Sequence, residues 1–307
     1  MVRRRAPIGR PAGLVAALVA ALVAAVALLV GPGAGWLPGH PPPRPAPAIG
    51  WPGGEAAYTT SEIGELRTAG SGAPVPIASV AKVMTAYVVL HERPLEVGEQ
   101  GPALTITAAD VEDTARRRAE GESVVPVAAG EQLTELQALQ ALLLPSANNV
   151  ALALARDTSG SVEAFVARMN DLADDLDMHD TTYTDPSGLA ASTVSTAHDQ
   201  VLLLDAALED RVLAGVLGST QADIPVAGTV LSTNTLLGHD GFVAGKTGSH
   251  DAAGGCLVFR VVRQVGDHEV TITGAVLGQR GGPQVQAALT AARDLAAQVA
   301  GSSDAQP

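Results

Sequence analysis

Ser79 and Lys82 are the two residues in this chain whose types and spacing most directly suggest chemistry. Residues three positions apart on a helix lie on the same face, so a hydroxyl and an amine can come within hydrogen-bonding distance. A serine hydroxyl is a weak nucleophile until a neighbouring base takes its proton, and a neutral lysine can be that base. The spacing therefore predicts Ser79 as a nucleophile and Lys82 as its base.

The sequence around Lys82 weakens the alternative that Ser79 only caps a helix and Lys82 is solvated. A helix is predicted over residues 80–92, and the immediate neighbours of Lys82 in it are all apolar: Val80, Ala81, Val83 and Met84. Such a helix is apolar nearly all round and is typical of a buried position. An unpaired buried lysine is costly. To act as a base, Lys82 needs a lowered pKa, which desolvation or a nearby cation such as Lys246 could supply.

Two further short motifs follow, Ser146-Ala147-Asn148 and Lys246-Thr247-Gly248. The first comes after Pro145, which ends one predicted apolar helix before the next begins. The loop between them can present the Ser146 hydroxyl and the Asn148 amide to a cleft. The second follows a strand-like run, where Lys and Thr could bind a carboxylate and Gly248 would let a substrate approach the backbone. Each motif alone is a weak signal, and Ser146 or Asn148 could equally be a helix cap.

The predicted elements form a consistent order along the chain. A short hairpin over residues 56–69 precedes a block of helices, and strands over 241–277 precede a closing helix over 284–299. This order predicts an α+β fold in which an antiparallel sheet, assembled from both chain ends, is flanked by helices. A helical lobe over about residues 79–220 would lie beside it, with the active site between the two.

The N-terminal region differs from the rest of the chain. Four arginines precede an uncharged apolar run over residues 13–30, which predicts a membrane anchor or a cleaved signal peptide over 1–30. Flanking arginines favour a cytoplasmic N-terminus, so the remainder should be exported, either membrane-anchored or secreted. We expect a Pro/Gly-rich linker over 31–53, a catalytic domain over 54–300 and a disordered tail over 301–307.

Charge and composition argue against nucleic-acid binding, and the spacing of the histidines argues against a metal-dependent hydrolase. The net charge is −13, and five of the 19 basic residues precede residue 49, where no acid occurs; the remainder has 14 basic and 32 acidic residues and carries −18. So acidic a domain, with 3% aromatics, is a poor partner for nucleic acid. Four His-Asp pairs, which begin at His179, His198, His239 and His250, could suggest a metal-dependent hydrolase. None has the spacing of paired metal ligands on a helix, so we predict no metal and no cofactor.

Between about residues 49 and 300 the chain resembles the serine D-alanyl-D-alanine carboxypeptidases, the low-molecular-mass penicillin-binding proteins with a β-lactamase/transpeptidase-like fold. The order S-x-x-K, S-x-N, K-T-G is shared by penicillin-binding proteins and class A β-lactamases. The similarity extends to other segments: Pro76-Ile77-Ala78, Met84-Thr85, Gly130-Glu131, Asp185-Pro186-Ser187-Gly188-Leu189 and Val276-Leu277-Gly278.

The resemblance implies a role for each residue of the motifs. Ser79 would be acylated by the penultimate D-Ala of a peptidoglycan stem peptide ending in D-Ala-D-Ala, with Lys82 as base. Ser146 would relay a proton, and Asn148 would position Lys82 and the substrate amide. The N–H groups of Ser79 and Ser249 would form the oxyanion hole. The substrate-binding residues implied are Lys246, Thr247, Gly248, Ser249 and Arg280. β-Lactam antibiotics would be covalent inhibitors.

The sequence also departs from the family. His250 stands where the family often has Thr. No loop resembling the deacylating Glu loop of class A β-lactamases is visible, which disfavours a β-lactamase-like hydrolase, the nearest alternative. A catalytically inactive wall-binding homologue is a further alternative, although the intact motifs argue against it. The N-terminal segment would supply the membrane partner.

Overall fold

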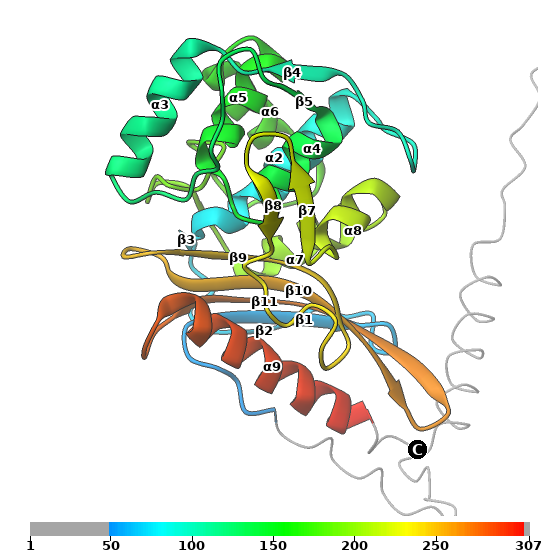
Figure 1. The fold of residues 1–307 in the computed structure, drawn as a ribbon. Helices are drawn as coiled ribbons and strands as arrows, with labels where there is room; N and C mark the ends of the chain where they lie inside the picture. Colours follow the sequence, from blue (N-terminus) through cyan, green and yellow to red (C-terminus); the bar gives the residue numbers. More distant parts are fainter. Residues whose placement is uncertain (1–48, 304–307) are drawn as a thin grey trace, which may run out of the picture. The chain divides into compact units, whose positions relative to one another are not determined.

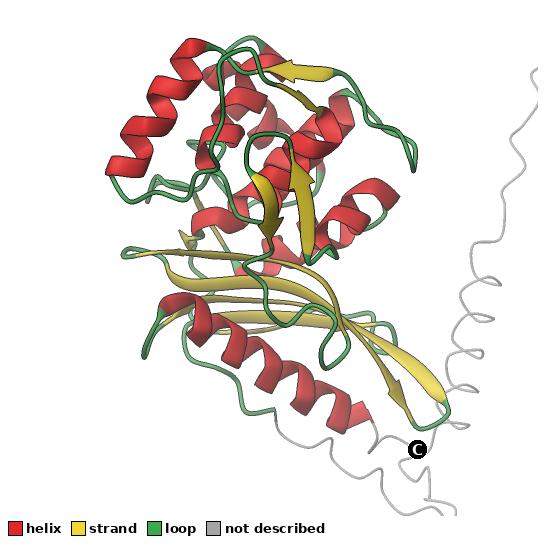
Figure 2. Cartoon of the chain, viewed as in Figure 1, coloured by secondary structure: helices red, strands yellow, loops and turns green. Residues whose placement is uncertain are grey.

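The computed structural model describes residues 49–303, in which a five-stranded antiparallel sheet lies between a layer of helices and the C-terminal helix (Figures 1 and 2). The strand order is β2-β1-β11-β10-β9. The strands are β1 (Glu55–Thr60), β2 (Arg67–Ala69), β9 (Phe242–His250), β10 (Gly254–Val265) and β11 (His268–Gln279). Both chain ends therefore contribute to one sheet, which confirms the predicted α+β class and places β9 at an edge.

Side chains alternate between the two faces of the sheet. In β10, Leu257 and Phe259 pack in the cluster that includes Leu289 and Leu295 of α9 (Gln284–Ser303). Cys256 and Val258, which alternate with them along the strand, belong to the second cluster, on the face toward the other helices. The single cysteine is thus a buried core residue. Helix α9 continues to Ser303, beyond the end at 299 that was predicted.

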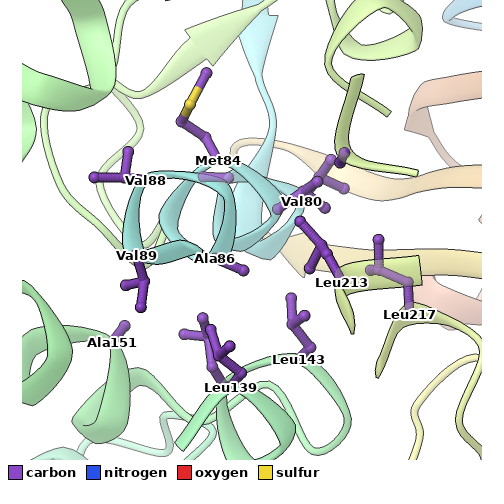
Figure 3. Packing of buried hydrophobic residues seen from close by; sticks show 14 of the residues in the cluster. Val80, Met84, Ala86, Val88, Val89, Leu139, Leu143, Ala151, Leu213 and Leu217 are labelled. Atoms are coloured by element: carbon purple, nitrogen blue, oxygen red, sulfur yellow. The ribbon is translucent and has the colours of Figure 1, made fainter. Parts of the chain in front are cut away.

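Helix α2 (Lys82–Glu92) lies at the centre of the helical layer, which explains why it is apolar nearly all round. Figure 3 shows Val89 of α2 near Ala151 of a neighbouring helix, and Val80, in the turn just before α2, near Leu213. The surrounding helices are α4 (Glu135–Leu143), α5 (Asn148–Ser159), α6 (Val162–Asp175), α7 (Ala197–Ala207) and α8 (Arg211–Leu217).

Helix caps follow the sequence closely. The side chain of Thr107 accepts a hydrogen bond from Asp110 N at the start of α3 (Ala108–Ala119), and Ser161 accepts one from Ala164 N at the start of α6. Both residues carry the side-chain oxygen that an N-cap requires. Thr134, in an extended conformation, caps α4, which therefore begins at Glu135.

Several short strand pairs and one short helix were not predicted. They are the pairs β3 (Val75–Pro76) with β6 (Val194–Ser195), β4 (Ala103–Thr105) with β5 (Gln132–Thr134), β7 (Gln221–Ile224) with β8 (Gly228–Leu231), and helix α8. Strands of two to four residues are too short to show a periodicity, and most of these pair with distant segments.

The predicted anchor or signal peptide over 1–30 lies outside the described residues, as does the linker up to residue 48. Within residues 49–303, no helix has the length and apolar character needed to span a bilayer.

Candidate active site

Ser79 lies in a 3-10 turn, η1 (Ala78–Ala81), directly before α2. In a 3-10 turn the side chains of residues i and i+3 are nearly eclipsed, which brings this serine and lysine together more closely than α-helical geometry does. Lys82 Nζ is 2.7 Å from Ser79 Oγ and donates to it. The pair therefore meets as the sequence predicted, although the element that brings it together is tighter than expected.

The Lys82 side chain is fully buried and surrounded by acceptors. Besides Ser79 Oγ, its Nζ donates to Asn148 Oδ1 at 2.7 Å and to the Ser187 carbonyl at 2.8 Å. Burial lowers the pKa of Lys82 well below the usual value of a lysine, and the positive charge of Lys246 lowers it further. Asp185 and Glu122 act in the opposite direction. The site thus favours the neutral amine that a general base requires.

Ser146, two residues before Asn148, has a strained backbone. Its φ of +66° is in the left-handed region, which a non-glycine residue rarely adopts. Its Oγ is buried and has no hydrogen-bond partner among the described residues. Strain and an unsatisfied hydroxyl cost free energy, and such features cluster at functional sites.

The second wall of the site is the edge strand β9. Lys246 and Thr247 are both almost fully buried, and Lys246 Nζ donates to the Thr247 carbonyl at 2.8 Å. Burial lowers the pKa of Lys246 to about 7. The Thr247 and Thr233 hydroxyls are 2.5 Å apart and hydrogen-bonded.

Gly248 is needed for the close approach of β9 to the nucleophile turn. A Cβ atom at this position would lie 2.9 Å from Ser79 N and Val80 N, and 3.0 Å from Ile77 O. These are backbone atoms, which cannot move aside without shifting η1. The glycine therefore sets the distance between the two walls.

A cavity of about 370 Å³ opens between these elements. Its lining residues come from η1, α5, β9 and the loops around 120 and 188: Ser79, Glu120, Gly121, Glu122, Ser123, Asn148, Gly188, Leu189, Ser249, His250 and Asp251. A second cavity, of about 330 Å³, lies between the β1–β2 pair and the start of α7 and contains none of the predicted site residues. Of these two cavities, the first contains the predicted nucleophile Ser79 together with Asn148 and Ser249.

Arg280 does not line this cavity. Its guanidinium donates to the carbonyls of Asp251 and Ala252, at 2.9 and 3.0 Å, and so holds the turn between β9 and β10. Its contact with a substrate carboxylate stays a prediction.

The sequence did not reveal which residues support Lys82. Asp185 accepts hydrogen bonds from Ser187 N, Ser187 Oγ and Leu189 N, and from the Thr193 hydroxyl. These bonds fix the loop whose Ser187 carbonyl accepts from Lys82. The Asp-Pro-Ser-Gly turn itself was recognisable, but its function depends on a contact 105 residues away in the sequence.

No group of three or more His, Cys, Asp or Glu side chains in residues 49–303 is arranged to hold a metal ion.

A serine hydrogen-bonded to a buried lysine, with a second buried lysine on the edge strand that packs against the serine's turn, is typical of a class of serine acyl-transfer enzymes. Comparison with known proteins identifies the family. A sequence profile of the D-alanyl-D-alanine carboxypeptidase family matches residues 65–280, and the chain belongs to this family.

Individual relatives and one solved structure agree with this family assignment. A D-alanyl-D-alanine endopeptidase of Escherichia coli is 33% identical over 61% of this chain, and a D-alanyl-D-alanine carboxypeptidase of Mycobacterium tuberculosis is 37% identical over 58%. Each match spans 59% of the relative's own length. The crystal structure of a Streptomyces DD-transpeptidase superposes with a TM-score of 0.69 at 26% identity, covering 82% of this chain and 97% of that one.

Proposed function

We propose that this protein is a serine-type D-alanyl-D-alanine carboxypeptidase that removes the terminal D-Ala from a peptidoglycan pentapeptide through an acyl-enzyme on Ser79. The observation that carries the proposal is the hydrogen bond between Ser79 Oγ and the fully buried amine of Lys82. The family and the relatives named for D-alanyl-D-alanine substrates support it.

The surroundings of Lys82 suit the first step. A neutral amine has two N–H groups and one lone pair, and the site offers two carbonyl acceptors, Asn148 Oδ1 and Ser187 O. With both N–H groups so engaged, the lone pair is left to accept the Ser79 hydroxyl proton. As Lys82 takes the proton, Ser79 Oγ attacks the penultimate D-Ala carbonyl and a tetrahedral intermediate forms.

The intermediate then collapses with release of D-Ala. The C–N bond breaks, and the proton held by Lys82 passes to the leaving amine, with Ser146 Oγ as the relay. This role suits a buried hydroxyl that has no partner among residues 49–303. We assign the oxyanion hole to the N–H groups of Ser79 and Ser249, since Ser249 lines the cavity with Ser79. Water subsequently hydrolyses the ester and regenerates Ser79.

Lys246 and Thr247 would bind the terminal carboxylate of the substrate. A carboxylate beside Lys246 would favour the charged form of an amine whose pKa burial has lowered to about 7. In a domain that carries −18 overall, such a local positive group is needed to attract an anionic substrate end. β-Lactams would acylate Ser79 in the same manner and act as covalent inhibitors.

We further propose that the enzyme acts outside the cytoplasm, where peptidoglycan lies. The Arg-rich, apolar N-terminal segment would direct export and either remain as a membrane anchor or be removed.

Release of D-Ala from a synthetic pentapeptide ending in D-Ala-D-Ala tests the function. The protein should release one D-Ala per peptide, and Ser79→Ala should release none while keeping its unfolding temperature. Release by Ser79→Ala at the wild-type rate would overturn the assignment.

A further inference from the structure

Glu122 lines the active-site cavity but has no counterpart in the three sequence motifs. We propose that Glu122 is a positioning residue, which fixes the Asn148 amide so that its oxygen, and not its nitrogen, faces Lys82. The inference rests on the proposed function, because it assigns Glu122 a role in preparing the base for acylation of Ser79.

The orientation of Asn148 follows from what each neighbour can accept or donate. Its Nδ2 is 2.8 Å from Glu122 Oε2, and its Oδ1 is 2.7 Å from Lys82 Nζ. An ionised carboxylate only accepts hydrogen bonds, so it selects the NH2 end of the amide. If the amide were reversed, its oxygen would face the Glu122 carboxylate, so that two acceptors met. Its NH2 group would then face the N–H groups of Lys82. Glu122 thereby delivers one of the two carbonyl oxygens that occupy the N–H groups of Lys82.

Glu122 is itself held in place. Its Oε2 accepts from Arg117 Nη1 at 2.7 Å, and Arg117 Nε donates to Asp113 at 2.6 Å. The side chains of Arg117 and Glu122 are only 9% and 7% exposed. The backbone closes the same corner, since Asn148 N donates to the Ser123 carbonyl at 2.8 Å. The end of α3 is thus joined to the start of α5 at the residue that contacts Lys82.

Loss of the Glu122 charge should shift the pKa of Lys82 in a direction that can be measured. Glu122 raises the pKa of Lys82, whereas Arg117 and Lys246 lower it and Asp185 raises it. The cavity also contains Glu120, Asp251 and His250, none of which hydrogen-bonds to Asn148. Replacing the carboxylate by a neutral amide should therefore lower the pKa of Lys82 and move the acid limb of the acylation profile to lower pH.

Two substitutions at this position separate geometry from charge. Glu122→Gln can keep an oxygen at the place of Oε2, which accepts from both Asn148 and Arg117, but it removes the charge. Glu122→Ala removes the acceptor as well. Glu131→Ala is the matched control, because Glu131 is a similarly buried carboxylate that accepts from Ala128 N and Val226 N and does not line the cavity.

The test is the rate of acylation by a fluorescent penicillin, measured from pH 5 to 9 with the unfolding temperature of each variant. We expect Glu122→Ala to lose roughly 10- to 100-fold in rate, as misplacement of a catalytic group does. Glu122→Gln should retain most of the rate with its acid limb shifted to lower pH, and Glu131→Ala should keep the wild-type profile.

Other outcomes overturn the inference. Acylation of Glu122→Ala at the wild-type rate would do so, as would a Glu122→Gln variant whose pH profile does not move. If Glu122→Ala fails to fold, the pH profile of Glu122→Gln decides alone. A wild-type protein that is not acylated at all would instead contradict the proposed function, so the two failures are distinguishable.

Discussion

The helical wall and the sheet wall of the cleft each bury one lysine, yet they surround it differently. Lys82 meets three acceptors from three separate segments, at Ser79, Asn148 and Ser187. Lys246 has a single hydrogen bond, to the carbonyl of the next residue in its own strand. Burial lowers the pKa of both lysines, and the charge of Lys246 lowers that of Lys82 further.

This difference separates two tasks that one residue type performs. When two carbonyl acceptors engage the N–H groups of a neutral lysine, its lone pair is left to take a proton from the serine hydroxyl. A lysine with spare donors on an edge strand is prepared to bind an anion from outside. The same desolvation serves both, and the neighbours decide which task is performed.

The largest effect is expected for Lys82→Met, which removes the base but keeps an apolar chain of similar length in the core. Loss of a general base costs about 10²- to 10⁴-fold in rate. We expect the rate of acylation by a fluorescent penicillin to fall by that factor while the unfolding temperature stays the same or rises, since a buried amine is removed. A Lys82→Met variant that is acylated at the wild-type rate would make Lys82 a structural residue.

Gly248→Ala tests the spacing of the two walls. The added Cβ would meet backbone atoms of Ser79 and Val80 at 2.9 Å, so β9 and η1 must separate. We expect acylation to slow by roughly 10- to 100-fold. Gly215→Ala, in α8, where a Cβ would meet nothing within 4 Å, is the control and should leave the rate unchanged. Equal rates for the two variants would show that the close approach does not matter.

Lys246→Met is expected to have a smaller effect and one of a different kind. Without the Lys246 charge the pKa of Lys82 should rise, because that charge lowers it. The acid limb of the acylation profile should then move to higher pH, opposite to the shift expected for Glu122→Gln. In pentapeptide hydrolysis, KM should rise about tenfold through loss of one charged hydrogen bond to the carboxylate. A limb that moved to lower pH would contradict this electrostatic account.

The smallest catalytic effect is expected at Glu135, a buried carboxylate of the helical layer outside the cleft. Its two oxygens have no hydrogen bond, Arg93 is 3.7 Å away, and burial raises its pKa from 4.5 to about 7. A raised folded pKa means that wild-type stability is full below pH 4.5 and is partly lost as the pH rises through 7. Glu135→Gln should abolish about 1–3 kcal/mol of this pH dependence in denaturant unfolding. The acylation rate should not change, and unchanged pH dependence of unfolding would contradict the prediction.

The sequence alone was sufficient to predict features that depend on residues close together in the chain. Ser79 and Lys82 lie in one turn, Thr107 and Ser161 cap the helices that follow them, and the strands of the sheet show clear patterns. Local spacing therefore predicted the fold class and the contact between Ser79 and Lys82.

The rest depends on contacts between distant segments. Glu122 and Asn148 are 26 residues apart, and Lys82 and Ser187 are 105 apart, so no periodicity could pair them. Arg280 was predicted as a substrate-binding residue from the family resemblance alone. Its guanidinium direction depends on the turn at Asp251, which the pattern does not encode. Short elements such as β7 and α8 carry too few residues for a periodic signal.

The most direct test of the account is peptide mapping by mass spectrometry after reaction with benzylpenicillin. The account predicts a single penicilloyl adduct, on the peptide that contains Ser79, and no adduct in Ser79→Ala. An adduct on any other residue, or none in the wild-type protein, would contradict the central claim that Ser79, activated by Lys82, is the nucleophile.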